Sequence, residues 1–137
     1  MKLKHLNERE GYLAYPLPDN VRKELLEMFP PQHERVVAHH ITYQFGVLPS
    51  AINRVPQYLW SPLIWVVGHQ NKEGVEVLVV EVEGAIERSD GKIYHITWSL
   101  APGIKPMQSN LILAQHGYVN LPTTKHYSFI STLQFFN

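Results

Sequence analysis

The chain has 137 residues, of which 45% are hydrophobic, so it has the length of one domain and enough apolar residues to bury a core. Its 12 Lys and Arg residues balance 12 Asp and Glu residues, which argues against a large basic surface for duplex DNA. The absence of cysteine excludes disulfides, thiolate metal sites and cysteine nucleophiles.

The first predicted elements are a strand and a helix. Residues 11–17 are typical of a short strand or an extended loop. Residues 19–28 are predicted to form a helix, because apolar residues recur there at helical spacing. Asp19 or Asn20 can cap the start of this helix, and two prolines beginning at Pro30 end it.

A second strand is predicted over residues 34–45, which are rich in β-branched and aromatic side chains. Gly46 is expected to end this strand. Residues 48–62 contain three prolines and are predicted to form a loop with one helical turn near Ala51.

The second half of the chain predicts strands joined by tight turns, followed by a helix and a last strand. The predicted strands are residues 63–70, 75–83, 85–88, 93–100 and 127–136. Glycine-containing turns at residues 71–74 and 89–91 join neighbouring strands into hairpins. Residues 106–116 are predicted to form a helix that Gly117 ends. Hairpins with two helices indicate an α+β fold with a mostly antiparallel sheet, in one domain over residues 1–137.

Two of the predicted strands contain the same short motif, His-Ile-Thr followed by an aromatic residue. The first copy runs from His40 to Thr42, and the second runs from His95 to Thr97. Chance predicts roughly 0.3 His-x-Thr motifs in a chain of this composition. The matched pair therefore indicates a shared role, although a solvated polar face with structural histidines remains an alternative reading.

Strand geometry predicts which side chains of each motif act together. Side chains alternate between the two faces of a strand, so His40 and Thr42 share one face and His95 and Thr97 share another. Phe45 falls on the opposite, apolar face of its strand, together with His39. If the two polar faces line one cleft, two imidazoles and two hydroxyls converge there.

This set of side chains suits cleavage of a ribose-linked phosphodiester. One histidine can take the proton of the 2′-hydroxyl, and the other can give a proton to the leaving oxygen. The threonine hydroxyls can donate hydrogen bonds to the phosphate oxygens as charge builds up. Threonine is a poor zinc ligand, and the adjacent His39 and His40 are expected to point to opposite faces of the strand. We therefore predict no metal and no other cofactor.

At these residues the sequence resembles the 2H phosphoesterase superfamily, which is named for two His-x-Thr/Ser motifs. Within it, the sequence is most similar to the phage anti-CBASS nucleases, which degrade the cyclic oligonucleotide signals of bacterial immunity. Three stretches carry this resemblance, and they are residues 39–46, residues 94–100 and residues 105–110.

The resemblance implies a two-lobed fold in which antiparallel sheets line a central cleft and helices pack outside. It implies His40 and His95 as acid and base and Thr42 and Thr97 as phosphate-binding hydroxyls. It also implies that Tyr12 stacks on a base of the substrate.

Two further residues are candidates for substrate binding on their own chemistry. Trp60, in the proline-rich loop, can stack on the ligand or close over it, and Lys105 can contact phosphate. A solvated surface role is the alternative for Lys105.

We therefore expect a metal-independent phosphodiesterase, with a small cyclic di- or trinucleotide or a short RNA as its partner. The alternatives are an RNA-repair 2′,3′-cyclic phosphodiesterase, a 2′-5′ oligonucleotide phosphodiesterase and a non-catalytic sponge that binds a cyclic nucleotide. Residues 1–8 contain no apolar leader segment, and no apolar run is long enough to span a membrane. We expect a cytoplasmic protein without a membrane partner, in the host cytoplasm if a phage encodes it.

Overall fold

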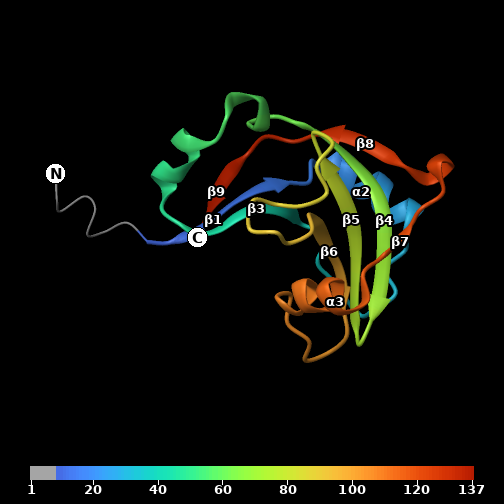
Figure 1. Ribbon diagram of the computed structural model, residues 1–137. Helices are drawn as coiled ribbons and strands as arrows, with labels where there is room; N and C mark the ends of the chain where they lie inside the picture. Colours follow the sequence, from blue (N-terminus) through green and yellow to red (C-terminus); the bar gives the residue numbers. More distant parts are fainter. Residues whose placement is uncertain (1–8) are drawn as a thin grey trace.

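The structure is a computed structural model that describes residues 9–137 (Figure 1). Residues 1–8, where we predict no apolar leader, lie outside the described residues. Within the described range, every helix is too short or too polar to cross a lipid bilayer.

Residues 9–137 contain nine strands, two α-helices and three short 3₁₀ helices. The strands are β1 (Gly11–Pro16), β2 (Arg35–Val36), β3 (His40–Val47), β4 (Leu63–Lys72), β5 (Val75–Val82), β6 (His95–Leu100), β7 (Val119–Asn120), β8 (Tyr127–Ile130) and β9 (Gln134–Phe136). The helices are α2 (Asp19–Met28), α3 (Gln108–His116), η1 (Pro49–Arg54), η2 (Gln57–Leu59) and η3 (Thr123–Lys125).

The strands form one open, antiparallel sheet in the order β7-β4-β5-β6-β3-β1-β9, with β2 paired to β6 and β8 paired to β4. The predicted two-lobed α+β fold with separate sheets is therefore wrong. The reason is that β3 and β6 pair directly, with Ile41 opposite Ile96. The amide of Ala38 extends this connection by donating to the Thr97 carbonyl at 3.0 Å. This pairing joins the two motif strands within one sheet.

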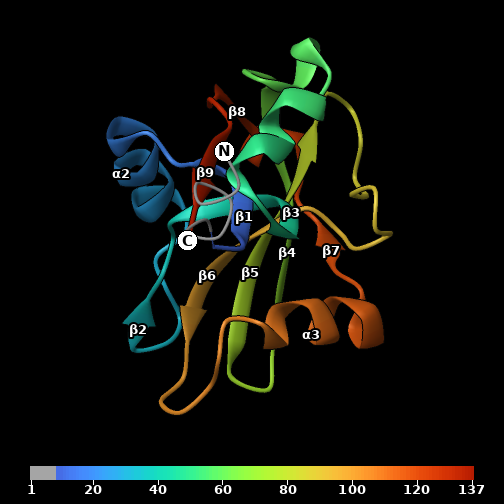
Figure 2. The ribbon, with the colours of Figure 1, turned by 90° about the vertical axis from the view of Figure 1, so that its left-hand side faces the viewer.

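Each face of the sheet is covered by one α-helix (Figure 2). On one face, Leu25 of α2 lies in a core with Ile96 and Trp98. On the other face, Ile112 and Leu113 of α3 pack against the valines of β5. Because α3 covers only part of that second face, the strand ends that carry the two motifs remain open beside it.

Several local predictions are confirmed. Helix α2 has the predicted bounds, and Gly117 ends α3 with a φ of 64°. The β4–β5 hairpin turns through Glu73 and Gly74, which both have positive φ, as a tight antiparallel turn requires. The predicted helix cap is wrong, because Pro18 occupies the cap position of α2 and no side chain bonds to the helix end.

Other predicted strands are divided. The strand over residues 34–45 breaks at Ala38, whose φ of 45° interrupts the extended backbone between β2 and β3. The last strand divides into β8, which pairs with β4, and β9, which pairs with β1. Residues 85–88 make only isolated bridges, at Ala85 and Glu87.

A bulge in β3 changes the predicted faces of that strand. Leu13 and Ala14 of β1 pair with Gln44 and Thr42, so that Tyr43 is an extra residue between them. The extra residue shifts the alternation of side chains. Phe45 consequently lies beside His40 and Thr42 rather than on the opposite face as predicted.

Candidate active site

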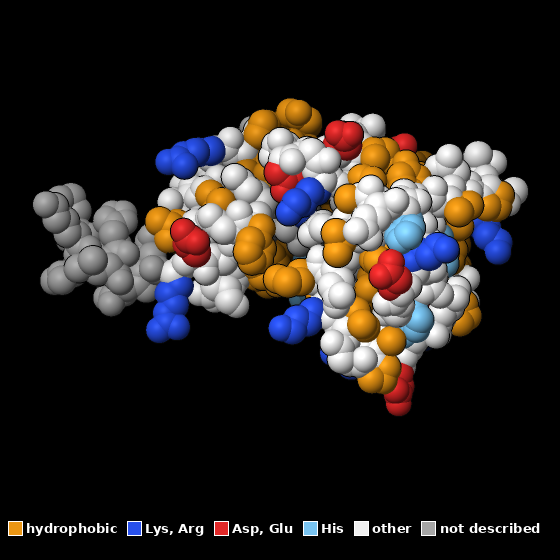
Figure 3. All heavy atoms as spheres, turned by 60° about the horizontal axis from the view of Figure 1, so that its bottom comes forward, with side chains coloured by type: hydrophobic (Ala, Val, Ile, Leu, Met, Phe, Trp, Pro, Cys, Tyr) orange, Lys and Arg blue, Asp and Glu red, His pale blue; other side chains and the backbone are white. Residues whose placement is uncertain are grey.

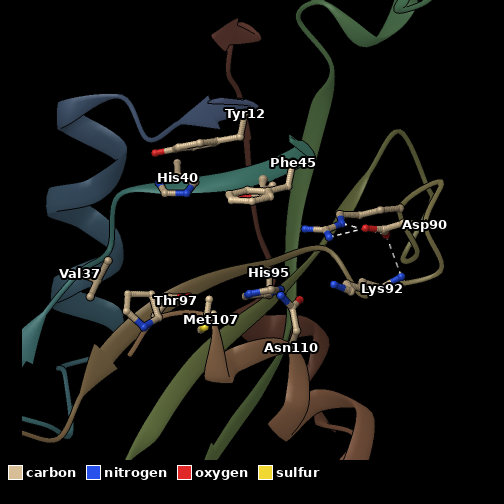
Figure 4. A pocket seen from close by; sticks show the side chains of 13 residues that line it. Tyr12, Val37, His40, Phe45, Asp90, Lys92, His95, Thr97, Met107 and Asn110 are labelled. Carbon is tan, nitrogen blue, oxygen red and sulfur yellow. Dashed lines mark hydrogen bonds and ion pairs between the residues drawn. The ribbon is translucent and has the colours of Figure 1, made fainter. Parts of the chain in front are cut away.

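A cavity of about 640 Å³ lies between the motif strands, the start of α3 and the turn at residues 88–92 (Figure 4). Hydrophobic side chains gather around a hollow on this side of the molecule (Figure 3). The residues that line the cavity are Tyr12, Val37, His40, Thr42, Phe45, Arg88, Asp90, Lys92, His95, Thr97, Pro106, Met107 and Asn110.

The four motif residues all lie in this lining. Because Ile41 and Ile96 face each other across antiparallel strands, His40 is adjacent to Thr97 and His95 is adjacent to Thr42. The two isoleucines are fully buried in the core below, which fixes the polar side chains on the opposite face. The cavity thus holds an imidazole beside a hydroxyl at two positions.

His95 is a buried and neutral imidazole. Its Nδ1 lies 2.8 Å from the carbonyl oxygen of Ile93, and since a carbonyl only accepts, Nδ1 carries the proton. Nε2 of the neutral ring is therefore an acceptor. Burial lowers the pKa of His95 to about 4, against the hydrogen bond to Ile93, and the Arg88 charge lowers it further. Near neutral pH, His95 can therefore take up a proton.

His40 lies under an aromatic group. Its ring centroid is 5.2 Å from that of Tyr12 and 6.2 Å from that of Phe136. Burial, followed by the neighbouring His39 and His95, lowers the pKa of His40 to about 4. The His40 ring is therefore also neutral near pH 7.

Tyr12, Phe45 and Phe136 form an aromatic shelf above His40. Tyr12 stacks with Phe45 at 6.1 Å and with Phe136 at 5.4 Å, at interplanar angles near 20°. Phe45 is 73% exposed, so this shelf offers an apolar surface to a ligand. A planar base can stack on such a surface.

The hydroxyl of Thr97 is held from α3. Its Oγ1 lies 2.9 Å from Oγ of Ser109, which is fully buried. When Ser109 donates in this pair, the Thr97 proton is free for a ligand. No side chain caps α3, and Ser109, within its first turn, orients a residue of the cavity.

The turn between residues 85–88 and β6 adds charge to the cavity. The Nε and Nη2 atoms of Arg88 donate to the two carboxylate oxygens of Asp90 at 3.1 and 2.6 Å. This pairing, opposed by partial burial, lowers the pKa of Asp90. The Arg88 side chain is only 4% exposed, and Lys92 lines the same corner of the cavity.

Asn110 reaches into the cavity from the first turn of α3 (Figure 4). Its Oδ1 atom is buried and has no hydrogen-bond partner. Buried polar atoms are generally paired, so this oxygen is available to a donor group of a ligand.

Sequence reasoning missed Phe45, Arg88, Asp90, Lys92 and Asn110. The sequence predicts a strand that ends at Arg88 and a turn over residues 89–91, with no binding role for either. The alternation of charge at Arg88, Asp90 and Lys92 is the sequence feature from which a charged corner could have been predicted. Asn110 ends the third stretch that carries the resemblance, residues 105–110, but no binding role was predicted for it.

Two of the predicted binding residues lie elsewhere. Trp60 follows η2, where its indole Nε1 donates to the Val55 carbonyl at 3.0 Å, and it is not part of the cavity lining. Lys105 is exposed beside the lining residue Pro106 but is not itself part of the lining. Tyr12 lies in the cavity, where base stacking was predicted.

Across residues 9–137, no three His, Asp or Glu side chains are grouped in a way that could hold a metal ion.

Comparison with known proteins gives a likeness in fold. No protein-family model and no curated protein matches the sequence. Among solved structures, a fungal RNA kinase superposes with a TM-score of 0.60 at 12% sequence identity. The superposition covers 96% of this chain and 46% of the kinase chain, so the protein spans less than half the length of that neighbour. At this identity the likeness is one of fold.

Proposed function

We propose that the protein is a phosphodiesterase that cleaves ribonucleotide phosphodiesters through attack by the 2′-hydroxyl. The observation that carries this proposal is the convergence of both His-x-Thr motifs on one cavity, from strands that pair with each other. An acid, a base and two hydroxyl donors are the groups this reaction needs.

The tautomer of His95 makes it the base. Its Nδ1 proton is committed to the Ile93 carbonyl, so Nε2 accepts the proton of the 2′-hydroxyl. The O2′–H bond breaks, O2′ bonds to phosphorus, and the bond from phosphorus to the 5′-oxygen breaks. His40 supplies the proton that the 5′-oxygen takes up. The first product carries a 2′,3′-cyclic phosphate, which water opens with the two histidines in reversed roles.

The hydroxyls and the charged corner stabilise the negative phosphate. Thr42 and Thr97 donate hydrogen bonds to its non-bridging oxygens, and Ser109 keeps the Thr97 hydroxyl in position. Losing one such donor typically lowers kcat by about 10²–10³. At one end of the cavity Arg88 is paired with Asp90, and Lys92 adds one net positive charge beside that pair. A substrate with a second phosphate would benefit from that charge.

The substrate we propose is a cyclic di- or trinucleotide, which makes the activity a phage counter-defence of the anti-CBASS kind. Three features support a small nucleotide with bases and more than one phosphate: the aromatic shelf, the charged corner and the absence of net charge. The fold likeness to a fungal RNA kinase favours RNA as the alternative substrate. The second candidate is therefore an RNA-directed enzyme, and the one we propose opens a terminal 2′,3′-cyclic phosphate.

The experiment incubates the purified protein, in EDTA, with cyclic di- and trinucleotides and with 2′,3′-cyclic mononucleotides. Products are separated by chromatography and identified by mass spectrometry. We expect linear products from the cyclic oligonucleotides, and no turnover by His40→Ala or His95→Ala. His116→Ala changes an exposed histidine outside the cavity and serves as the matched control. Opening of the mononucleotides alone would favour the RNA-repair candidate, whereas binding without any product would refute catalysis.

A further inference from the structure

His39 lies directly against His40, contrary to the prediction that the two point apart. The two Nδ1 atoms are 2.8 Å apart, and the ring planes meet at 81°. Successive side chains of a regular strand point to opposite faces, but His39 precedes β3 and follows the left-handed Ala38. That backbone conformation brings the exposed His39 ring against the ring of the half-buried His40.

The backbone at this turn is held from three elements. The Ala38 amide donates to Thr97 of β6, and the Ala38 carbonyl accepts from Nε of Arg22 in α2 at 2.8 Å. The His39 carbonyl accepts from the amide of Leu17, which follows β1. These hydrogen bonds fix the backbone conformation that brings the two imidazoles into contact.

A ring nitrogen pair at 2.8 Å shares one proton. When His39 donates it, His40 Nδ1 is the acceptor and His40 Nε2 carries the proton that can reach the cavity. A neutral imidazole that gave up this proton alone would become an anion, which is unfavourable in a partly buried site. His40 therefore needs a second proton at the moment the first one leaves.

We propose that His39 supplies that proton, so that His39 and His40 act together as the acid of the reaction. This inference rests on the proposed function. The His40 Nε2 proton moves to the departing 5′-oxygen as the His39 Nδ1 proton moves to His40 Nδ1. Two N–H bonds break, and one N–H bond and one O–H bond form. His39 changes from imidazolium to neutral imidazole, while His40 is neutral before and after.

The same transfer prepares the second step. His40 now has its proton on Nδ1 and a free Nε2, which can accept a proton from the water that opens the cyclic phosphate. As that proton arrives, the Nδ1 proton returns to His39, and the pair regains its starting state.

The surroundings of the pair fit this role. The exposed His39 can exchange protons with water. Its ring centroid lies 5.9 Å from that of Phe136 in β9, with the two ring planes at 73°. The titratable groups that face His40 are Tyr12 of β1, His95 of β6 and His39 itself. Burial, followed by the neighbouring His39 and His95, lowers the pKa of His40 to about 4, which keeps the positive charge off His40.

The test compares two leaving groups in wild type, His39→Asn and His39→Ala. One substrate is the ribonucleotide that the wild type cleaves fastest, and the other is the 4-nitrophenyl ester of the same 3′-nucleotide. Nitrophenolate leaves without a proton, whereas a nucleoside 5′-oxygen requires one. Asparagine can still donate a hydrogen bond to His40, but it cannot release a proton.

We expect His39→Asn and His39→Ala to lower kcat on the nucleotide about 10²-fold, the usual contribution of an acid, with KM unchanged. Both should cleave the nitrophenyl ester within twofold of wild type. Equal losses of kcat on both substrates, or full activity of His39→Asn on the nucleotide, would refute the proton transfer from His39. Either result would leave the proposed function standing. A wild type that cleaves neither substrate would refute the proposed function and this inference with it.

Discussion

The burial of a neutral His95 should make the stability of the protein depend on pH. Its folded pKa is about 4 and that of a free histidine is 6.5, so between these values the unfolded chain binds the extra proton. The stability is therefore complete above pH 6.5 and falls as the pH drops toward 4. From the two pKa values, the loss between pH 7.5 and pH 5 is about 2 kcal/mol for this one residue.

The variant that tests this effect is His95→Asn. An asparagine amide can replace Nδ1–H as the donor to the Ile93 carbonyl, but it does not titrate. Urea unfolding is followed by fluorescence of the buried Trp98 at pH 7.5 and pH 5. The wild type should lose about 2 kcal/mol more than the variant between these two conditions.

Thr97→Val is the matched control, since it changes the same cavity and removes no titrating group. Its free energy of unfolding should follow the pH dependence of the wild type. If His95→Asn also followed the wild type, His95 would titrate equally in the folded and unfolded chain. The assignment of His95 as a buried neutral base would then be refuted.

Two further predictions concern the shelf and the core. Tyr12→Ala should weaken nucleotide binding by about 1–3 kcal/mol, because the stacking contact is lost. Tyr12→Phe keeps the ring and should bind nucleotide within twofold of wild type. Both affinities are measured by calorimetry in the His95→Asn variant, so that the nucleotide is not cleaved. Equal losses in both Tyr12 variants would contradict stacking. Glu76 is 1% exposed, and its carboxylate accepts hydrogen bonds from the Ser99 hydroxyl at 2.6 Å and from the Gln32 amide at 2.9 Å. Glu76→Leu leaves these donors without an acceptor and should lower the free energy of unfolding by about 3 kcal/mol. Glu76→Gln, which keeps an acceptor, should lose less in the same urea titration, and equal losses would show that these bonds do not stabilise the fold.

Local patterns predicted the helix and the hairpin. The apolar spacing of α2 predicted the helix and the prolines after it predicted its end, although the predicted cap at its start is wrong. The turn at Glu73 and Gly74 is a short-range feature that two adjacent residues specify. The alternation that buries Ile41 and Ile96 likewise placed His40 and His95 on the opposite, polar face.

Pairing between distant strands could not be predicted in this way. The sequence around Ile41 contains nothing that selects Ile96 as its partner, so one sheet and two sheets were equally compatible with the strand patterns. The bulge at Tyr43 arises from the register against β1, and it decides that Phe45 faces the cavity. The register depends on both paired strands, so it cannot be predicted from the alternation of side chains in one of them.

The contact between His39 and His40 has a similar origin. It depends on a positive φ at Ala38, where alanine has no local preference for that conformation. Hydrogen bonds from Arg22 and to Thr97 hold this backbone, and both partners come from other elements. The alternation of side chains along a strand therefore predicted, wrongly, that the two rings lie on opposite faces.

In the proposed mechanism a 2′-hydroxyl, activated by His95, attacks the phosphate. The most direct measurement incubates the wild-type protein with a ribonucleotide substrate and with the same molecule carrying a 2′-deoxyribose at the scissile position, followed by mass spectrometry of the products. We expect the ribonucleotide to give a 2′,3′-cyclic phosphate and the deoxy substrate to remain intact. Cleavage of both substrates at similar rates would show that water attacks directly, and it would contradict the mechanism.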